Sequence, residues 1–352
     1  METGKSVSLL KDRVLRFMQG RKQRIVLGLS GYIICAAAIA GIMYALSLGN
    51  SAWISHDAGR FHEMARMIVE GMRPYVDYID PKPPLLFFSV SVMDLAAPAG
   101  TIDTAVMTVL NLLCACLIWK LGEEDYGFLA GYTAGFLFLV ASVFTEGYFL
   151  FSEQFAILFL LLSLVAARRH AWVWAGVCVG LAIGYKQYAL VAILPLLYFM
   201  WASGDKRYYR FLIPVAVVII VMFAALFAAY GSETGWSGIY YTFGVMPEYI
   251  SGKVTPFPTY APDSPLSFAA NAMASVAVVL PTLVFAIASL IRRGLRTPFE
   301  IVLGLFLVLL LGTLLIRQYL HYWILLLPFL VLFACREFAD DKNGNPGEVS
   351  KI

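Results

Sequence analysis

The residues best suited to chemistry lie between Trp53 and Phe88, a charged and proline-punctuated segment that follows the first long apolar run. Asp57 follows His56 at the start of a stretch with helical spacing. A carboxylate at the boundary between water and lipid could accept a proton from an incoming hydroxyl group, because partial desolvation raises its basicity. The simpler interpretation is that Asp57 only caps the helix through a backbone N–H group.

Lys82 lies in the sequence Asp-Pro-Lys-Pro-Pro. The prolines exclude regular helix and restrict the backbone, so the lysine is displayed in a limited set of orientations. A restrained ammonium group at the level of the lipid headgroups suits a lipid phosphate. The alternative is that Lys82 snorkels to the interface from the apolar run that follows it.

Two glutamates flank Tyr148, and the second, Glu153, lies about one turn into an apolar stretch. Ionisable residues inside a span cost about 2.5–3.5 kcal/mol on insertion scales, so they are functional by default. We expect Glu153 to be a functional carboxylate and Glu146 to be an interface residue. Lys186 interrupts another long apolar region, and contact with an anion would explain a lysine on the outer face.

Arg317, Tyr319 and His321 form a further cluster at the start of the last apolar run. Arg317 and His321 are four residues apart and would share a helix face if that stretch is helical, where together they could form a second phosphate clamp. An aromatic belt at the membrane interface is the alternative for the tyrosines. The sequence contains no phosphate-binding loop, dinucleotide fingerprint or HExxH motif, and no cluster of metal ligands argues for a bound ion.

The composition indicates which elements must position these residues. Of the 352 residues, 60% are hydrophobic and 14% are charged, against about 25% charged in soluble domains. The charges separate apolar runs of about 15–25 residues, long enough to cross a hydrocarbon core. We therefore predict an all-α polytopic membrane protein with no nucleic-acid partner, in which the five cysteines are small core residues.

The predicted organisation has three parts. Residues 1–24 carry seven basic residues, typical of an amphipathic segment on the cytoplasmic leaflet or of a solvated tail. Residues 25–336 form the membrane domain, and residues 337–352 form a cytoplasmic tail. Within the domain, 48–103 is the first outer loop with surface helices, and 231–265 is an outer loop whose aromatic residues could contact a sugar or a prenyl chain, or pack on the membrane.

The run from Pro84 to Gly100 admits two interpretations. If it spans the membrane, the later basic clusters fall outside; if it is a surface or re-entrant helix, they fall inside, as is usual. We choose the second, which places both termini in the cytoplasm and the candidate residues outside. The predicted spans then lie near 25–47, 104–121, 127–145, 148–167, 171–185, 187–203, 211–230, 266–291, 299–316 and 322–336.

Three groups of residues carry a resemblance to a known family. The first is HDAGRFHEMARMIVEGMRPYVDYIDPKPPL, and the later ones are YFLFSEQF with GYKQY, and RQYLHYWILLLP. In order and position they resemble the GT-C glycosyltransferases, and more closely the branch of the protein O-mannosyltransferases and aminoarabinose transferases (glycosyltransferase family 39-like). The resemblance implies a GT-C-type bundle of about ten transmembrane helices in the plasma or inner membrane.

The same resemblance implies a function. A sugar would pass from a polyprenyl-phosphate donor to a hydroxyl acceptor on a glycan, lipid or protein, at the extracytoplasmic face and with inversion. Asp57 and Glu153 would be the catalytic carboxylates, and the phosphate would be bound by the basic residues. The basic residues are Lys82, Arg317, His321 and Lys186, and the candidate substrate contacts are His56, Tyr75, Glu146, Tyr148 and Tyr319.

Two features depart from the family pattern: Glu153 stands where relatives often show aspartate, and no C-terminal periplasmic domain follows the last span. A loosely held divalent cation is left open. The rival function is a lipid-linked sugar flippase or small-solute transporter, which would distribute its charges through the bilayer midplane. A catalytically inactive relative that acts as an assembly partner is a third interpretation, although it would not need Asp57, Lys82 and Glu153 together.

Overall fold

The computed structural model describes residues 20–48, 56–245, 248, 265–314 and 319–339. In these ranges all regular secondary structure is helical, and the only β-type pairing is an isolated bridge between Pro74 and Tyr78. The all-α class predicted from composition is therefore confirmed. Most of the basic segment 1–24 and of the tail 337–352 lies outside the described residues.

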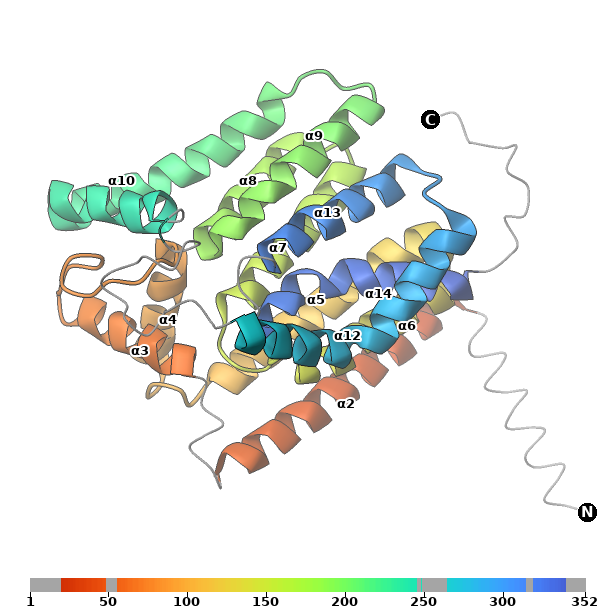
Figure 1. Cartoon of the computed structure of the whole chain (residues 1–352), viewed down its shortest axis with the longest axis horizontal. Coiled ribbons are helices and arrows are strands. Elements are labelled where there is room, and N and C mark those ends of the chain that lie inside the picture. Colours follow the sequence, from red (N-terminus) through yellow and green to blue (C-terminus); the bar gives the residue numbers. More distant parts are fainter. Residues whose placement is uncertain (1–19, 49–55, 246–247, 249–264, 315–318, 340–352) are drawn as a thin grey trace, which may run out of the picture.

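The helices form one bundle, with long helices roughly side by side and two short helices set across one end (Figure 1). In chain order they are α2 (Arg21–Leu48), α3 (His56–Val69), α4 (Pro84–Ala96), α5 (Asp103–Tyr126), α6 (Phe128–Phe144), α7 (Ser152–Arg168), α8 (Trp172–Tyr185), α9 (Ile193–Ala202), α10 (Tyr209–Ile239), α12 (Pro265–Arg293), α13 (Pro298–Leu314) and α14 (Leu327–Cys335). Shorter turns are η2 (Gln187–Ala192), η3 (Tyr240–Gly244), η5 (Leu320–Leu325) and η6 (Arg336–Phe338).

Within the described ranges, four helical segments are long and apolar enough to cross a membrane. They are Lys22–Ala45, Asp103–Tyr126, Tyr209–Gly244 and Ser275–Arg293. Their outward faces carry exposed apolar side chains such as Ile34, Ile220 and Phe285, which suits contact with lipid rather than water. The chain is thus a helical membrane protein. Each of the ten predicted spans overlaps a helical segment, but the shorter helices leave the number of crossings a prediction.

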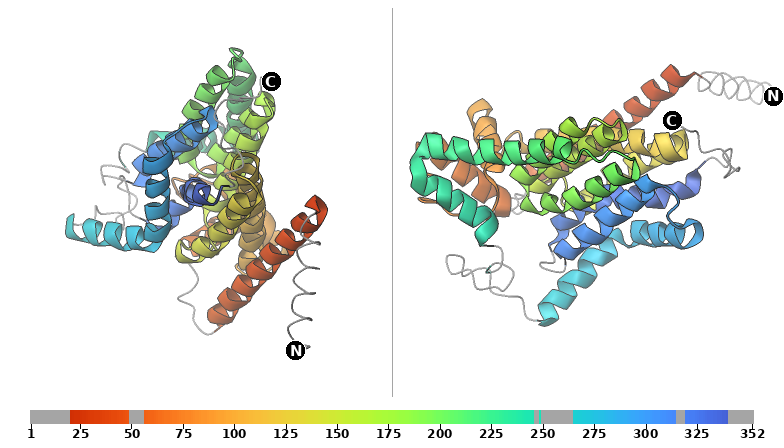
Figure 2. Two further views of the ribbon diagram at one scale, coloured as in Figure 1. Left: turned by 90° about the vertical axis from the view of Figure 1, so that its right-hand side faces the viewer. Right: turned by 90° about the horizontal axis from the view of Figure 1, so that it is seen from above.

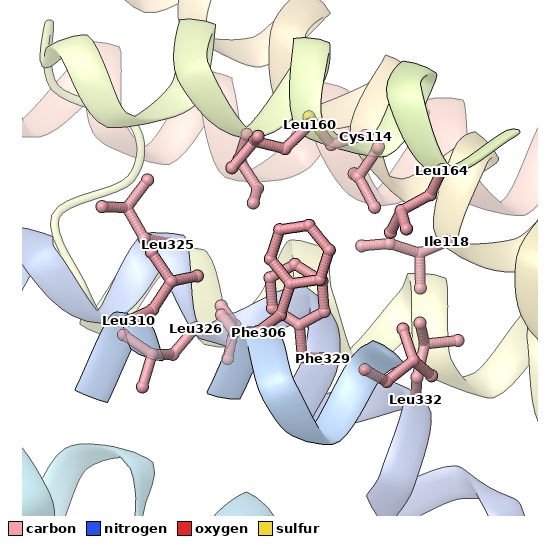
Figure 3. Close-up of a cluster of buried hydrophobic side chains, with 14 of the residues drawn as sticks. Cys114, Ile118, Leu160, Leu164, Phe306, Leu310, Leu325, Leu326, Phe329 and Leu332 are labelled. Carbon is pink, nitrogen blue, oxygen red and sulfur yellow. The ribbon is translucent and has the colours of Figure 1, made fainter. Parts of the chain in front are cut away.

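The centre of the bundle is an apolar core shared by α5, α7, α13 and α14 (Figure 3). The rings of Phe306 and Phe329 stack there with their centroids 4.7 Å apart. Glycine lets α5 and α6 approach closely, since a Cβ at Gly131 would lie only 2.4 Å from the amide nitrogen of Glu123. Such small-residue contacts drive helix association in membranes, where burial from water contributes little. Helices α2 and α12 lie at the periphery of this core (Figure 2).

Helices α3 and α4 form a separate small unit at one end of the bundle. The predicted amphipathic stripe is buried against α4, with Phe61, Met64 and Ala65 fully covered. Helix α4 has 13 residues, so it is about 20 Å long and shorter than a hydrocarbon core of about 30 Å. Helices α8 and α14, which were predicted to span, are similarly short or shorter, so the surface position of this run stays a prediction.

Helix α10 corrects one predicted boundary. The segment from residue 231 was predicted to be a loop, but the chain bends at Gly231 (φ 84°, ψ 178°) and is helical again to Ile239. Only glycine adopts this left-handed conformation readily, and the first proline after it is Pro247, so a second helical stretch can form. The aromatic residues up to Phe243 are therefore helical, whereas residues 246–247 and 249–264 lie outside the described part of the chain.

The opposite end of the bundle holds a network of ion pairs. The buried Arg336 guanidinium donates to Glu300 Oε1 at 2.8 Å and to the carbonyl oxygens of Ser289 and Gly294. Arg168 pairs nearby with Glu124 at 3.2 Å. A buried charge is tolerated when it is paired and hydrogen-bonded in this way. These groups join the ends of neighbouring helices, so we assign them a structural role.

Candidate functional site

The loop that carries Lys82 is held by three hydrogen bonds. The amide of Lys82 donates to Asp80 Oδ1 at 3.0 Å, and the Tyr75 hydroxyl donates to the Lys82 carbonyl at 2.8 Å. Gln187, from the turn after α8, donates its side-chain amide to the Pro81 carbonyl at 2.9 Å. With prolines on both sides, the backbone of Lys82 therefore has little freedom. The display of this lysine predicted from the prolines is achieved by tertiary contacts as well.

Lys82 faces Asp57 across the small α3–α4 unit. Its Nζ lies 3.5 Å from Asp57 Oδ2 and 3.6 Å from Asp80 Oδ1, and 4.6 Å from the centroid of the Phe61 ring. The side chains of Lys82 and Asp57 keep 13% and 27% of their surface exposed. A ligand can therefore reach both groups without unfolding the loop.

The charge state of Asp57 follows from its surroundings. Burial alone would raise its pKa, but the ammonium groups of Lys82 and Lys186, with His321 and Arg60, hold the pKa below its ordinary value. Asp57 is therefore an ionised hydrogen-bond acceptor at neutral pH. It lies within the first turn of α3, where the helix dipole also favours a negative charge.

A second ion pair lies deeper, between Lys186 and Glu153. Lys186 breaks the helix after Tyr185, and its Nζ lies 2.6 Å from Glu153 Oε1 with both side chains buried. The ammonium also faces the ring of Tyr322 at 4.4 Å and that of Tyr188 at 5.3 Å. Cation–π contacts of this kind replace part of the lost hydration of a buried lysine. Glu153, predicted to be the second catalytic carboxylate, is here engaged by Lys186.

His321 occupies a slot between two aromatic rings. Phe151 stacks on it with centroids 4.0 Å apart, and Tyr319 stacks on it at 5.5 Å. The Nδ1 atom lies 3.3 Å from Glu146 Oε2. Glu146 has a left-handed backbone (φ 62°), a strained conformation for a residue other than glycine. The strain turns the chain between α6 and α7, so that Glu146 is a partner of His321 rather than only an interface residue.

These pairs belong to one site. Gln187, the neighbour of Lys186, bonds the carbonyl of Pro81, the neighbour of Lys82. The Lys186 ammonium faces the ring of Tyr322, whose centroid lies 5.0 Å from that of His321. The structure thus brings together six predicted residues from separate parts of the chain: Asp57, Lys82, Glu146, Glu153, Lys186 and His321.

Four other predictions have different outcomes. Tyr75 and Tyr148, proposed as substrate contacts, are buried, and their hydroxyls donate to the carbonyls of Lys82 and Leu139. In this structure they support the backbone. Arg317 and the side chain of His56 lie outside the described residues.

Tyr319, which precedes the described turn, has an extended backbone (φ −89°, ψ 139°), and the turn begins at Leu320. The prediction that Arg317 and His321 share a helix face involves residues outside the described part of the chain and stays a prediction. Tyr319 itself lies against His321, as its proposed place in the site requires.

Several residues of the site were missed by the sequence reasoning. Asp80 is buried, and its carboxylate contacts both the backbone amide and the ammonium group of Lys82. The signal was present, because an aspartate two residues before another residue commonly forms a side-chain-to-backbone turn. Gln187 and Phe151 carry no such signal, since their contacts join residues distant in the chain.

The described residues include no group of three or more histidine, cysteine or carboxylate side chains arranged to hold a metal ion. The described side chains of the site themselves offer charges and hydrogen bonds. Two ammonium groups and an imidazole can neutralise an anion, while the ionised Asp57 can orient a hydroxyl group. The set suits transfer or binding of a group attached to phosphate.

No protein-family model matches the chain, and a search of curated proteins found no match. The resemblance to the GT-C glycosyltransferases therefore rests on the motifs alone. The class that fold and composition define is a helical membrane protein with a charged site at one end of its bundle.

Proposed function

We propose that the protein is an integral membrane glycosyltransferase that moves a sugar from a polyprenyl-phosphate donor to a hydroxyl acceptor. The observation that carries the proposal is the partly exposed pair of Lys82 and Asp57, backed by the buried pair of Lys186 and Glu153. The pair of Lys82 and Asp57 offers a cation and a carboxylate to a ligand. The buried pair holds a second cation, Lys186, close behind the first pair. Two cations suit the charge that develops on a phosphate leaving group, and a carboxylate suits a hydroxyl nucleophile.

In the proposed reaction the acceptor oxygen attacks the anomeric carbon from the face opposite the phosphate. The acceptor O–H proton passes to Asp57, the new glycosidic C–O bond forms, and the bond from the anomeric carbon to the phosphate oxygen breaks. Its electron pair leaves with the polyprenyl phosphate, whose charge is stabilised by Lys82 and Lys186. The configuration at the anomeric carbon inverts. A phosphate neutralised in this way needs no strong general acid.

Binding of the donor would also activate Asp57. In the free protein Lys82 is shared between Asp57 and Asp80. A phosphate that takes over Lys82 removes that cation from Asp57 and adds a negative charge, and both changes raise the basicity of Asp57. The carboxylate thus becomes a better proton acceptor when the donor is present.

The topology remains part of the proposal. The candidate site and the network around Arg336 lie at opposite ends of the bundle, and the basic clusters near Arg168 and Arg292 lie with the latter. If positive charge marks the cytoplasmic side, the site faces outward and both termini face inward. The charges of the candidate site lie at one end of the bundle, which favours the transferase over the flippase or transporter, since either of those would need charges at the midplane.

The test is native mass spectrometry of the purified protein with a panel of polyprenyl phosphates and polyprenyl-phosphate sugars. We expect one donor to bind, and Lys82→Ala to weaken it by roughly 10- to 150-fold, since a charged hydrogen bond contributes about 1.5–3 kcal/mol. Lys82→Arg should recover part of the affinity. Lys206 is an exposed lysine in the α9–α10 turn. Lys206→Ala is therefore the control, and it should bind the donor with the affinity of the wild type.

The donor retained in that experiment is then offered with hydroxyl acceptors, and Asp57→Asn is compared with the wild type. We expect Asp57→Asn to bind the donor and to transfer the sugar about 10²–10⁴ times more slowly. Transfer at the wild-type rate would remove Asp57 from its role. Absence of binding to every lipid in the panel would make transport the leading account.

A further inference from the structure

A second charged group lies outside the candidate site, where α3, α4 and α5 meet. The Nδ1 atom of His62 on α3 lies 2.8 Å from Asp94 Oδ1 near the end of α4. Its Nε2 atom lies 2.8 Å from Asp103 Oδ2 at the start of α5. Both ring nitrogens face carboxylates, so both must donate for each carboxylate to be satisfied. Only the protonated imidazolium has two N–H donors.

The two carboxylates have few other partners. The second oxygen of each, Asp94 Oδ2 and Asp103 Oδ1, is buried and accepts no hydrogen bond among the described residues. The side chains of Asp94 and Asp103 are each only 13% exposed. Without the imidazolium, two negative charges would face each other in a partly desolvated position, which is strongly unfavourable.

The remaining charged groups near His62 come from its own helix. Glu63, Arg66 and Glu70 line a shallow cavity of about 410 Å³ together with His62 and Asp94. Arg66 pairs with Glu70 at 3.5 Å on the exposed side. In the part of the chain that the structure describes, the positive charge that bridges the two aspartates is therefore His62, and Arg66 is engaged elsewhere.

We infer that His62 is a protonation-dependent latch: its imidazolium ties α3 to the ends of α4 and α5, and its deprotonation loosens α3, which stays packed on α4 through its apolar face. The inference stands on the geometry of the three side chains and does not require the proposed transferase activity. The contact connects the end of α4 with the start of α5, and it adds a charged connection to the apolar packing that already holds α3 and α4 on the main bundle. Opening it would remove this connection at one end of α3, the helix that carries Asp57, while the apolar packing remains.

The direction of the pH dependence follows from the surroundings of His62. Burial lowers the pKa of His62, but hydrogen bonds and charges from Asp103 and Asp94 outweigh it, and the pKa is raised above its ordinary value. The latch is thus fully stabilising below about pH 6.5, the ordinary value. Its contribution is lost as the pH rises through the raised pKa, so the latch opens at a pH above the ordinary value for histidine.

The experiment is hydrogen–deuterium exchange of the full-length protein in lipid nanodiscs from pH 6 to 9, with exchange times corrected for the intrinsic rate. We expect corrected exchange in peptides of α3 to rise with pH, by up to about tenfold per unit once His62 titrates. Peptides from α7, in the core, should not change. Asp94→Asn and Asp103→Asn each remove a negative charge that raises the pKa of His62, so each should move the exchange transition to lower pH.

Two variants complete the test. Arg66→Gln removes a charge from the same helix without touching the latch, and it should keep the wild-type transition. His62→Gln should exchange rapidly in α3 at every pH, with no transition. The assignment is checked by histidine-labelled nuclear magnetic resonance of the wild type, where the signal lost in His62→Gln should titrate at the midpoint of the exchange transition. Protection of α3 that is constant through that midpoint would overturn the inference, whether or not the protein transfers sugars.

Discussion

The ammonium of Lys82 lies 3.5 Å from the carboxylate of Asp57, and both side chains remain partly exposed. The neighbouring pair of Lys186 and Glu153 is closer, at 2.6 Å, and fully buried. The two pairs therefore differ in kind. The first can exchange partners with an incoming anion, whereas the second is a fixed charge whose separation would leave an unpaired ion in the protein interior.

The exchangeable pair of Lys82 and Asp57 predicts that the pH profiles of kcat/KM and of kcat for sugar transfer differ. The acid limb of kcat/KM reports the free protein, in which the pKa of Asp57 is lowered by Lys82 and its neighbours against the effect of burial. We expect kcat/KM for sugar transfer to stay flat as the pH falls from 7.5 to 5, because Asp57 remains ionised. The acid limb of kcat should lie at higher pH, since the donor phosphate occupies Lys82. Steady-state kinetics measures both, and coincident limbs would contradict the exchange of Lys82.

The fixed pair predicts non-additive effects on stability. Glu153→Gln or Lys186→Met alone leaves one buried charge unpaired and should destabilise the protein by about 3–5 kcal/mol. The double variant removes both charges and should be destabilised by less than the sum of the two. Thermal unfolding in detergent, with the four proteins in parallel, measures the coupling. Additive losses would show that the two side chains act independently.

Tyr75 offers a test of how the Lys82 loop is held. Tyr75→Phe removes the hydrogen bond to the Lys82 carbonyl and leaves the buried ring in place. We expect a loss of stability of about 0.5–1.5 kcal/mol, together with a several-fold weaker donor affinity because the loop is less restrained. Tyr148→Phe is the matched control, as its hydroxyl bonds the Leu139 carbonyl away from the loop. Donor titration and thermal unfolding separate the two effects.

The proposed orientation predicts which residues a membrane-impermeant thiol reagent reaches. Ala99, after α4, and Ser203, in the α9–α10 turn, are exposed at opposite ends of the bundle. In intact cells we expect Ala99→Cys to be labelled and Ser203→Cys to be labelled only after permeabilisation. The wild type measures background from the five native cysteines, which are buried or half-buried where the structure describes them. Labelling in the reverse order would invert the topology.

Local patterns in the sequence determined much of the architecture. The separation of charges from apolar runs predicts the all-helical membrane class. The helical spacing of apolar residues around Phe61 and Met64 predicts the amphipathic helix α3. These features depend on spacing within one element, so they can be read from neighbouring residues. The prolines around Lys82 likewise identify a restrained loop. The same reasoning was wrong for residues 231–244, where a single glycine bends the helix rather than ending it.

The pairing of the charges was decided only by the tertiary structure. Nothing in the spacing of Lys186 and Glu153 shows that they meet, nor that Glu146 faces His321 or that Tyr75 supports Lys82. The His62 latch is equally long-range, since its partners begin and end other helices. An ion pair depends on a separation of a few ångströms between side chains, and that separation is set by the packing of whole helices. The types of residue and their spacing along the chain therefore identified the candidate groups, while the packing of the helices decided which of these groups act together.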